Sequence, residues 1–190
     1  MTHQDIASSH RAAAHRLIAT SAAASLYRRV LIPACDLLHC LGGPPRSPEA
    51  DRFLLAIAGQ ESAWHHRAQV LASGRKGPAR GFWQFEMRGG VYGVLKHRLT
   101  AEPAAALVAA RGHDDELHAI WRALEDDDVL AAGFARLLLW TLPAALPTNA
   151  AEGWRQYLAA WRPGKPHPDR WPANWQAAVE VVAEIAQEEE

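Results

Sequence analysis

The segment from Pro48 to about Trp64 constrains the fold of this chain most strongly. Ser47, Pro48 and Glu49 form a helix start, because they supply a hydroxyl cap, a proline in the first turn and an acid near the positive helix end. At about 100° per residue, the apolar side chains of the segment share one face; they are Phe53, Leu54, Ile57, Ala58 and Trp64. This face must be buried, so the other elements are expected to pack around the helix.

Glu61 falls within the same apolar arc, whereas Asp51, Arg52 and Ser62 lie elsewhere around the helix. Burying a charged carboxylate is costly, and a merely solvated glutamate has no reason to occupy such a position. The helical position of Glu61 therefore indicates a chemical role.

Residues 72–90 break the helical pattern. They contain too many glycines for a helix, together with one proline: Gly74, Gly77, Pro78, Gly81, Gly89 and Gly90. A small β-hairpin or an irregular loop is expected here. Helices are predicted on both sides of it, over 5–24, 26–41 with a start or kink at Pro33, beyond Thr100, Asp114 and Asp126–Asp128, and over 152–161 and 175–186.

These elements predict a mostly α fold with a small β or irregular insert, in one domain spanning 1–190. Within it we expect N-terminal helices over 1–46, a core carrying Glu61 over 47–166 and a C-terminal helix over 167–190. A chain of 190 residues with 49% hydrophobic residues is long enough and apolar enough for one packed core.

The charge distribution argues against a dedicated nucleic-acid protein, because the net charge is only −1. Between Glu61 and Arg98, however, seven basic residues face only two acidic ones, Glu61 and Glu86. This excess is either a positive rim for an anionic polymer or an ordinary solvated loop. Cys35 and Cys40 point to opposite sides of a helix and are expected to be free, partly buried thiols.

No signal peptide is visible, and no run approaches the roughly 18 apolar residues of a membrane span. Synthesis in a cytosol without membrane insertion is expected. The ten histidines do not form a recognised metal-ligand spacing, and no phosphate loop or nucleophile elbow occurs. No metal and no cofactor are therefore predicted.

Cleavage of a glycosidic bond requires an acid that an apolar setting keeps protonated, and Glu61 suits that role. Trp64, Phe82 and Trp83 are candidates to shield it from water. Sugars also pack their C–H faces on aromatic rings. Most of the eight tryptophans are nevertheless expected in the core.

Three blocks resemble the signatures of lytic transglycosylases and goose-type lysozymes, in the same order and at similar spacing. They are Glu61-Ser62, then Ala79-x-Gly81-Phe82-Trp83-Gln84, then Ala159-Ala160-Trp161-Arg162-Pro163-Gly164. The family has Glu-Ser, Gly-Ala-x-Gly-Leu-Met-Gln and Ala-Tyr-Asn-x-Gly at these places. The segments GPARGFWQFE and WRPGKP are similar in sequence to those of small phage-encoded members.

The resemblance implies a lysozyme-like fold with Glu61 as the catalytic acid and Gln84 as a substrate-contacting amide. Trp161 takes the place of a tyrosine near the acid, although an indole offers no hydroxyl. Arg162 replaces the usual asparagine, and Arg75 stands where the family has a serine. These departures concern substrate binding more than the identity of the acid.

Glu86 leaves two mechanisms open. Transglycosylases work with one carboxylate and yield an anhydro sugar, whereas goose-type lysozymes resemble this chain in carrying an acid two residues after the glutamine. Inverting hydrolysis needs such a second carboxylate, which helps water attack. Alternatively, Glu86 pairs with Arg80 or Arg88 and has no chemical role.

The sequence thus predicts a peptidoglycan-cleaving lytic transglycosylase acting on the MurNAc–GlcNAc β-1,4 bond. The alternatives are a hydrolytic lysozyme, and a glycan-binding or virion structural protein without turnover. Predicted substrate-binding residues are Ser62, Gly81, Phe82, Trp83, Gln84 and Trp161, beside catalytic Glu61 and Glu86. The expected partners are a peptidoglycan strand and other phage or virion proteins, with delivery to the wall by a phage particle or a membrane lesion.

Overall fold

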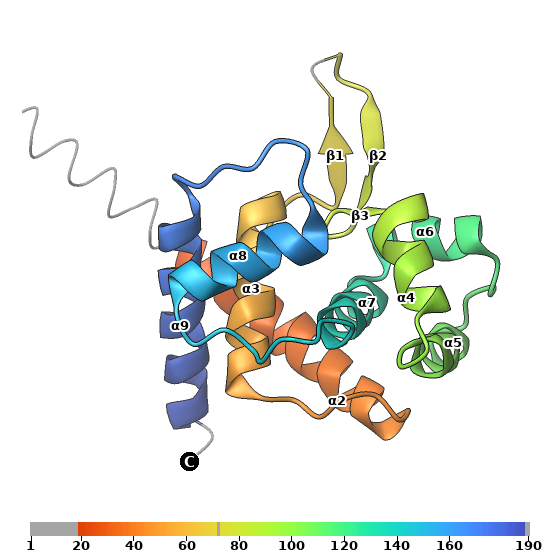
Figure 1. The fold of residues 1–190 in the computed structure, drawn as a ribbon, viewed down its shortest axis with the longest axis horizontal. Coiled ribbons are helices and arrows are strands. Elements are labelled where there is room, and N and C mark those ends of the chain that lie inside the picture. The colour runs from red at the N-terminus through yellow and green to blue at the C-terminus, as the bar shows by residue number, and fades with distance from the viewer. Residues whose placement is uncertain (1–18, 72, 189–190) are drawn as a thin grey trace, which may run out of the picture.

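Helix α3 (Pro48–Ser62) runs through the middle of the fold and packs along α9 (Trp171–Glu188) (Figure 1). The computed structural model describes residues 19–71 and 73–188. As predicted, Ser47 caps α3: its Oγ accepts a hydrogen bond from the Ala50 amide at 3.2 Å. The helix ends at Ser62 rather than at Trp64, because Ala63 and Trp64 adopt left-handed conformations with φ of 51° and 59°.

The N-terminal part of the described chain is helical. Residues 19–26 lead into a π-helical turn, η1 (Tyr27–Leu31), and then into α2 (Ile32–Cys40). The irregularity predicted at Pro33 is this wider turn, since a proline cannot donate to the turn before it. The helix predicted over 5–24 is present from residue 19, and its earlier part lies outside the described residues.

The predicted insert is a three-stranded antiparallel sheet in the order β1 (Ala68–Val70), β2 (Lys76–Arg80) and β3 (Phe85–Glu86). The β1–β2 hairpin projects from the helical body (Figure 1). The end of the insert differs from expectation: a π-helical turn, η2 (Met87–Val91), follows β3 at once and continues into α4 (Tyr92–Lys96). The two adjacent glycines of η2 therefore belong to a helical turn rather than to a loop.

The remaining helices are α5 (Ala101–Ala110), α6 (Leu117–Asp126), α7 (Asp128–Trp140) and α8 (Ala150–Trp161). Side-chain caps fix the starts of α6, α7 and α8: Asp127 accepts from the Leu130 amide at 2.9 Å, for example, and Asn149 accepts from the Glu152 amide at 3.0 Å. Thr100, the N-cap of α5, makes no side-chain cap hydrogen bond. The helix expected after Asp114 begins at Leu117, because Glu116 is its N-cap.

The fold is mostly helical with a small antiparallel sheet, as the sequence predicted. One continuous cluster of buried hydrophobic residues connects helices from both ends of the described chain with the sheet. Cys35 is fully buried and Cys40 is exposed, and both are free thiols, so the two sulfurs do face opposite sides. Within the described ranges, no helix has the length and apolar content that crossing a membrane would require.

Candidate functional site

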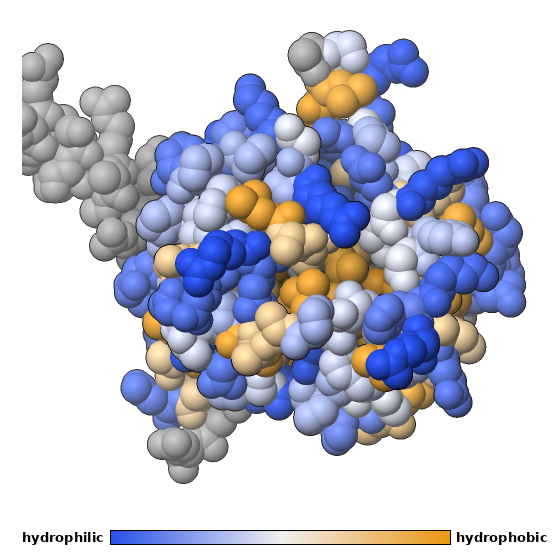
Figure 2. Space-filling view, viewed as in Figure 1, coloured by the Kyte–Doolittle hydropathy of each residue, from blue (hydrophilic) through white to orange (hydrophobic). Residues whose placement is uncertain are grey.

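A cleft of about 790 Å³ lies at the C-terminal end of α3. Its walls come from the sheet, η2, the end of α7, α8 and the loop from α8 to α9. We call it the Glu61 cleft; the residues discussed below that line it are Glu61, Gln84, Glu86, Tyr157 and Trp161. Figure 2 shows this face hollowed between α8 and α4, with a hydrophobic floor framed by hydrophilic side chains.

Glu61 occupies the last turn of α3, where its carboxyl group is largely removed from water. The Tyr157 hydroxyl donates a hydrogen bond to Oε1 of Glu61 at 2.7 Å. Burial raises the pKa of Glu61 to about 7, and the hydrogen bond from Tyr157 opposes part of that rise. A carboxyl group with this pKa holds its proton in a large share of molecules at neutral pH and can therefore act as a general acid.

Tyr157 is the functional residue that the sequence analysis missed. The tyrosine position was given to Trp161, but the hydroxyl beside Glu61 comes from Tyr157, one helical turn earlier on α8. The ring of Tyr157 stacks on Trp171 with a centroid distance of 5.4 Å and an interplanar angle of 15°. Burial and the neighbouring Glu61 raise the pKa of Tyr157, so it remains a neutral donor. The sequence offered one signal for Tyr157: it lies four residues before Trp161 and therefore on the same face of the predicted helix.

Trp161 lines the cleft, but its indole N–H does not donate to Glu61. Its Nε1 donates to the Trp83 carbonyl at 3.0 Å, and its ring lies 6.3 Å from that of Phe85. This places Trp161 on the wall that the sheet and α8 share. A sugar ring could pack there, as expected for a partly exposed indole.

Trp83 does not flank the cleft, contrary to expectation. Its side chain is 0% exposed, and its Nε1 donates to the Leu54 carbonyl at 2.9 Å. Trp64 is likewise buried and donates to the Leu55 carbonyl at 2.9 Å. Both indoles satisfy carbonyl groups of α3 and are core residues, because a buried N–H requires a partner.

Three further predicted contacts have structural roles. Ser62 is buried and donates to the Ala58 carbonyl at 2.7 Å, one turn back in α3. Gly81 has φ of +72°, and a Cβ there would lie 2.7 Å from the Leu124 carbonyl oxygen. The guanidinium carbon of Arg67 lies over the Phe82 ring, 4.6 Å from the ring centroid, and Phe82 lines a different cavity. These three positions shape the site without lining the Glu61 cleft.

Gln84 lies where the sequence analysis expected a substrate-contacting amide. It adopts φ of 50°, and its Nε2 donates to the Gly81 carbonyl at 2.8 Å, which fixes the side chain at the turn between β2 and β3. No described residue donates to its Oε1. This oxygen is therefore a positioned acceptor in the cleft.

Glu86 is an exposed carboxylate on β3 that lines the same cleft as Glu61. The pairing of Glu86 with Arg80 or Arg88 that the sequence suggested is wrong for both arginines: Arg80 binds Glu125 instead, with 2.9 Å between Nε and Oε2. Glu86 forms no ion pair with Arg88 or with any other residue in the described ranges. Its carboxylate is thus available to a substrate or a water molecule.

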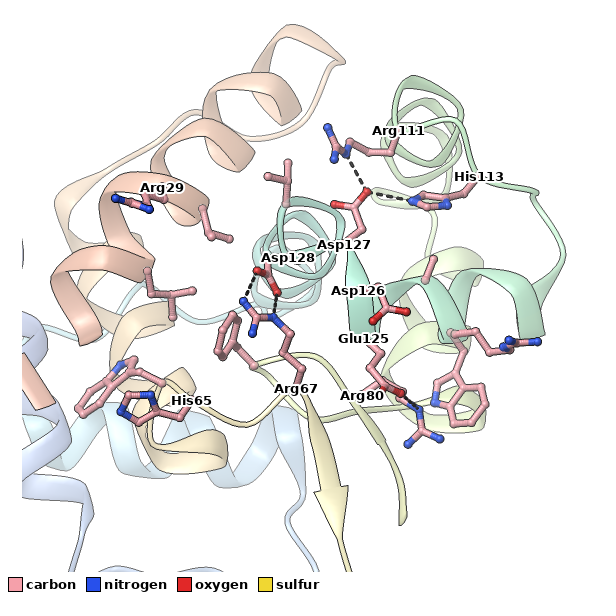
Figure 3. Close-up of a pocket in the computed structure, with 18 of the residues that line it drawn as sticks. Arg29, His65, Arg67, Arg80, Arg111, His113, Glu125, Asp126, Asp127 and Asp128 are labelled. Atoms are coloured by element: carbon pink, nitrogen blue, oxygen red, sulfur yellow. Dashed lines mark hydrogen bonds and ion pairs between the residues drawn. The ribbon is translucent and has the colours of Figure 1, made fainter. Parts of the chain in front are cut away.

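A second cavity, about 1440 Å³, lies on the opposite side of β2. Ala79 lines the Glu61 cleft while Arg80 lines this second cavity, since successive strand residues point to opposite faces. We call it the charged groove. Figure 3 shows its side chains joined in ion pairs, in which basic residues from the sheet region and from the segment after α5 meet acids at the α6–α7 junction.

The ion pairs of the charged groove account for three of the seven basic residues between Glu61 and Arg98, namely Arg67, Lys76 and Arg80. Arg67 binds Asp128 through two hydrogen bonds of 2.7 Å, and Arg80 pairs with Glu125 (Figure 3). Lys76 also pairs with Glu125. These cations are neutralised within the protein and do not form a free positive rim.

Asp127 sits between Arg111 and His113, each 2.9 Å from its Oδ2. Burial opposes its ionisation, but hydrogen bonds from Arg111, the Leu130 amide and His113 outweigh burial and lower the pKa of Asp127. It is therefore a structural cap rather than a solvated acid. No group of three His, Cys, Asp or Glu side chains among residues 19–71 and 73–188 is arranged to hold a metal ion.

The structure brings together Glu61, Gln84, Glu86 and Trp161 from the predicted site, adds Tyr157, and excludes Ser62, Gly81, Phe82 and Trp83 from the cleft wall. The arrangement can donate a proton to a bound molecule and accept hydrogen bonds from it. No protein-family model matches the chain, and neither a curated protein nor a solved structure shows significant similarity to it.

Proposed function

We propose that this protein cleaves the β-1,4 bond between MurNAc and GlcNAc in peptidoglycan as a lytic transglycosylase. The observation that carries the proposal is a partly buried carboxyl group, Glu61, with a pKa of about 7 in an open cleft and a tyrosine hydroxyl hydrogen-bonded to it. Three ordered sequence blocks that resemble the family add support, and the mostly helical fold with a small sheet beside the cleft is compatible with it.

Glu61 performs both proton transfers in this mechanism. Protonated Glu61 gives its proton to the bridging oxygen as the bond to C1 of the muramic sugar breaks. The resulting carboxylate takes the proton of the 6-hydroxyl while O6 bonds to C1, which yields an anhydro end and restores the acid. Tyr157 stabilises the carboxylate between the two steps, because its hydroxyl donates to Oε1.

The decisive test is Glu61→Gln. Because glutamine keeps the shape and can still accept from Tyr157 but cannot donate a proton as an acid, we expect loss of at least about a hundredfold in turbidity clearance of purified cell walls. Glu184→Gln on α9, an exposed acid outside the cleft, is the matched control and should retain activity. Retention of most activity by Glu61→Gln would rule out the proposal.

One observation favours hydrolysis as a second candidate. Glu86 lines the same cleft with an unpaired carboxylate, as a base that activates water would. Mass spectrometry of the released muropeptides separates the two reactions, because a transglycosylase leaves anhydro ends and a hydrolase leaves reducing ends. We expect anhydro ends that persist in Glu86→Gln. Reducing ends that disappear in that variant would assign hydrolysis instead.

The Trp161-Arg162 pair replaces the tyrosine and asparagine of the family, and this departure favours an alternative class, a protein that binds glycan or builds a virion without turnover. Tyr157 supplies the hydroxyl that Trp161 lacks, so the departure argues less strongly for that class. Binding of glycan oligomers without cleavage during long incubation would support this class. The proposed partner is the glycan strand, reached by delivery in a phage particle or through a membrane lesion, alongside other phage or virion proteins.

A further inference from the structure

Cationic side chains surround the Glu61 cleft. Arg88 comes from η2, and Lys165 and Arg170 come from the loop that joins α8 to α9. All three line the cleft and are exposed to solvent. Arg162, a fourth cation of the rim, donates from Nε to the Ala159 carbonyl at 3.3 Å and so helps to hold its own turn.

The first three cations differ from those of the charged groove in having no protein partner. Arg88, Lys165 and Arg170 form no side-chain hydrogen bond or ion pair with any residue among 19–71 and 73–188. By contrast, Arg67, Lys76, Arg80 and Arg111 of the groove are each paired with a carboxylate. The groove thus pairs four of its cations with its own carboxylates, whereas these three cations of the cleft have no carboxylate partner among the described residues.

The cleft contains few anions to balance this charge. Among the described residues that line it, the carboxyl groups are Glu61, whose pKa of about 7 leaves it protonated in a large share of molecules near neutral pH, and the exposed Glu86. Several positive charges around a concave site raise the local concentration of anions and pair with them on binding. A neutral polysaccharide would leave these charges without partners.

We infer that Arg88, Lys165 and Arg170 bind carboxylates of the substrate and make the cleft specific for an anionic glycan strand. This inference rests on the proposed function. The carboxylates have two sources in peptidoglycan, namely the lactyl group of the muramic sugar and the peptide stems attached to it. Both offer the same partner to a guanidinium or ammonium group.

Three substrates separate these sources. The first is intact strands with peptide stems; the second is strands stripped of stems by an amidase, which exposes the lactyl carboxylates. The third is stripped strands whose carboxylates have been converted to amides, so that the same glycan is neutral. The wild-type protein should cleave the two anionic substrates roughly threefold to tenfold faster than the neutral one, since exposed ion pairs contribute modestly each. A larger rate on intact than on stripped strands would assign the stems as the main source.

The triple variant Arg88→Gln, Lys165→Gln, Arg170→Gln should bring the anionic-to-neutral ratio close to one. Its matched control is Arg75→Gln, Arg98→Gln, Arg155→Gln, which removes the same charge at exposed positions outside the cleft and should keep the wild-type ratio. The wild-type ratio should also shrink at about 1 M salt, where charges are screened beyond roughly 3 Å. Equal wild-type rates on all three substrates, or an unchanged ratio in the triple variant, would overturn the inference.

A binding assay tests carboxylate recognition independently of the proposed cleavage. Glu61→Gln, which cannot turn over the strand, should sediment with the two anionic polymers more than with the neutral one. If the wild type cleaves nothing but this binding preference holds, the proposed function fails and carboxylate recognition stands. If Glu61→Gln binds all three equally, carboxylate recognition fails whatever the cleavage assay shows.

Discussion

At the scale of single residues, the site depends on one carboxyl group and one hydroxyl group. Burial raises the pKa of Glu61 towards neutrality, while the hydrogen bond from Tyr157 keeps the charged form accessible. The proposed mechanism uses Glu61 first as an acid and then as a base, so it needs both forms near the working pH, and these two opposed effects provide them. The neutral tyrosine is thus a tuning group for Glu61 rather than a second acid.

Tyr157→Phe tests this relation. Removing the donor to the carboxylate should raise the pKa of Glu61 further, so the alkaline limb of the pH profile of kcat/KM should move to higher pH. The rate at the optimum should fall, because the carboxylate formed during the reaction loses a partner.

Tyr92→Phe is the control, since Tyr92 is an exposed tyrosine that does not line the cleft. Its profile should match that of the wild type. A lower rate in Tyr157→Phe with an unmoved limb would mean that Tyr157 acts only through packing.

At the scale of elements, the end of α3 and the turn from β2 to β3 form the rigid frame of the cleft. The indoles of Trp64 and Trp83 donate to successive carbonyls of α3. The first bond holds the segment after α3 against this helix, and the second holds the turn from β2 to β3 against it. Gly81 begins that turn against the last residues of α6. Gln84, at the end of the turn, is therefore positioned by buried contacts on both sides.

Gly81→Ala should destabilise the protein more than Gly74→Ala. Both glycines have a positive φ, +72° and +77°, so both substitutions strain the backbone by roughly 1 kcal/mol. Only Gly81 also meets the Leu124 carbonyl, with a Cβ distance of 2.7 Å, whereas Gly74 has nothing within 4 Å. We expect an additional loss of about 1–3 kcal/mol for Gly81→Ala in denaturant unfolding. Equal losses in the two variants would show that the turn does not need this close approach.

At the scale of the whole molecule, buried carboxyl groups make stability depend on pH. Burial raises the pKa of Glu61 to about 7 from 4.5 and that of Asp51 to about 6 from 3.8. The folded state therefore binds protons more tightly than the unfolded state, and the free energy of unfolding falls as pH rises from the unfolded to the folded pKa values. Asp51 lies in the core beside Tyr27, whose hydroxyl donates to Oδ2 at 2.8 Å.

Glu61→Gln should remove one part of this dependence. At pH 8 the variant should be more stable than the wild type by up to about 3 kcal/mol, since one unit of pKa shift corresponds to about 1.36 kcal/mol. At pH 5 the gain should be much smaller, because wild-type Glu61 is protonated in the folded state. Urea unfolding of the variant and the wild type at the two pH values measures this gain in stability. The contribution of Asp51 cancels, because both proteins carry this residue. The same gain at both pH values would contradict the raised pKa.

The sequence by itself determined the features that depend on neighbours along the chain. The cap at Ser47 and the small sheet around the glycine-rich segment were predictable, because caps and turn residues act within a few positions. The predicted apolar face of α3 was wrong in part, since Asp51 and Ser62, 1% and 3% exposed, are buried more fully than Glu61. Only the tertiary structure decided the contacts across the chain.

Helical periodicity could not show that the hydroxyl 96 residues away, on Tyr157, would reach Glu61 in place of Trp161. Composition counted the basic residues near the sheet, but their partners on α6 and α7 became visible only once these helices packed against it. Trp83 and Trp161 look alike in sequence. Packing against α3 buried the first and left the second on the cleft wall, because only the folded chain fixes which apolar surfaces are covered.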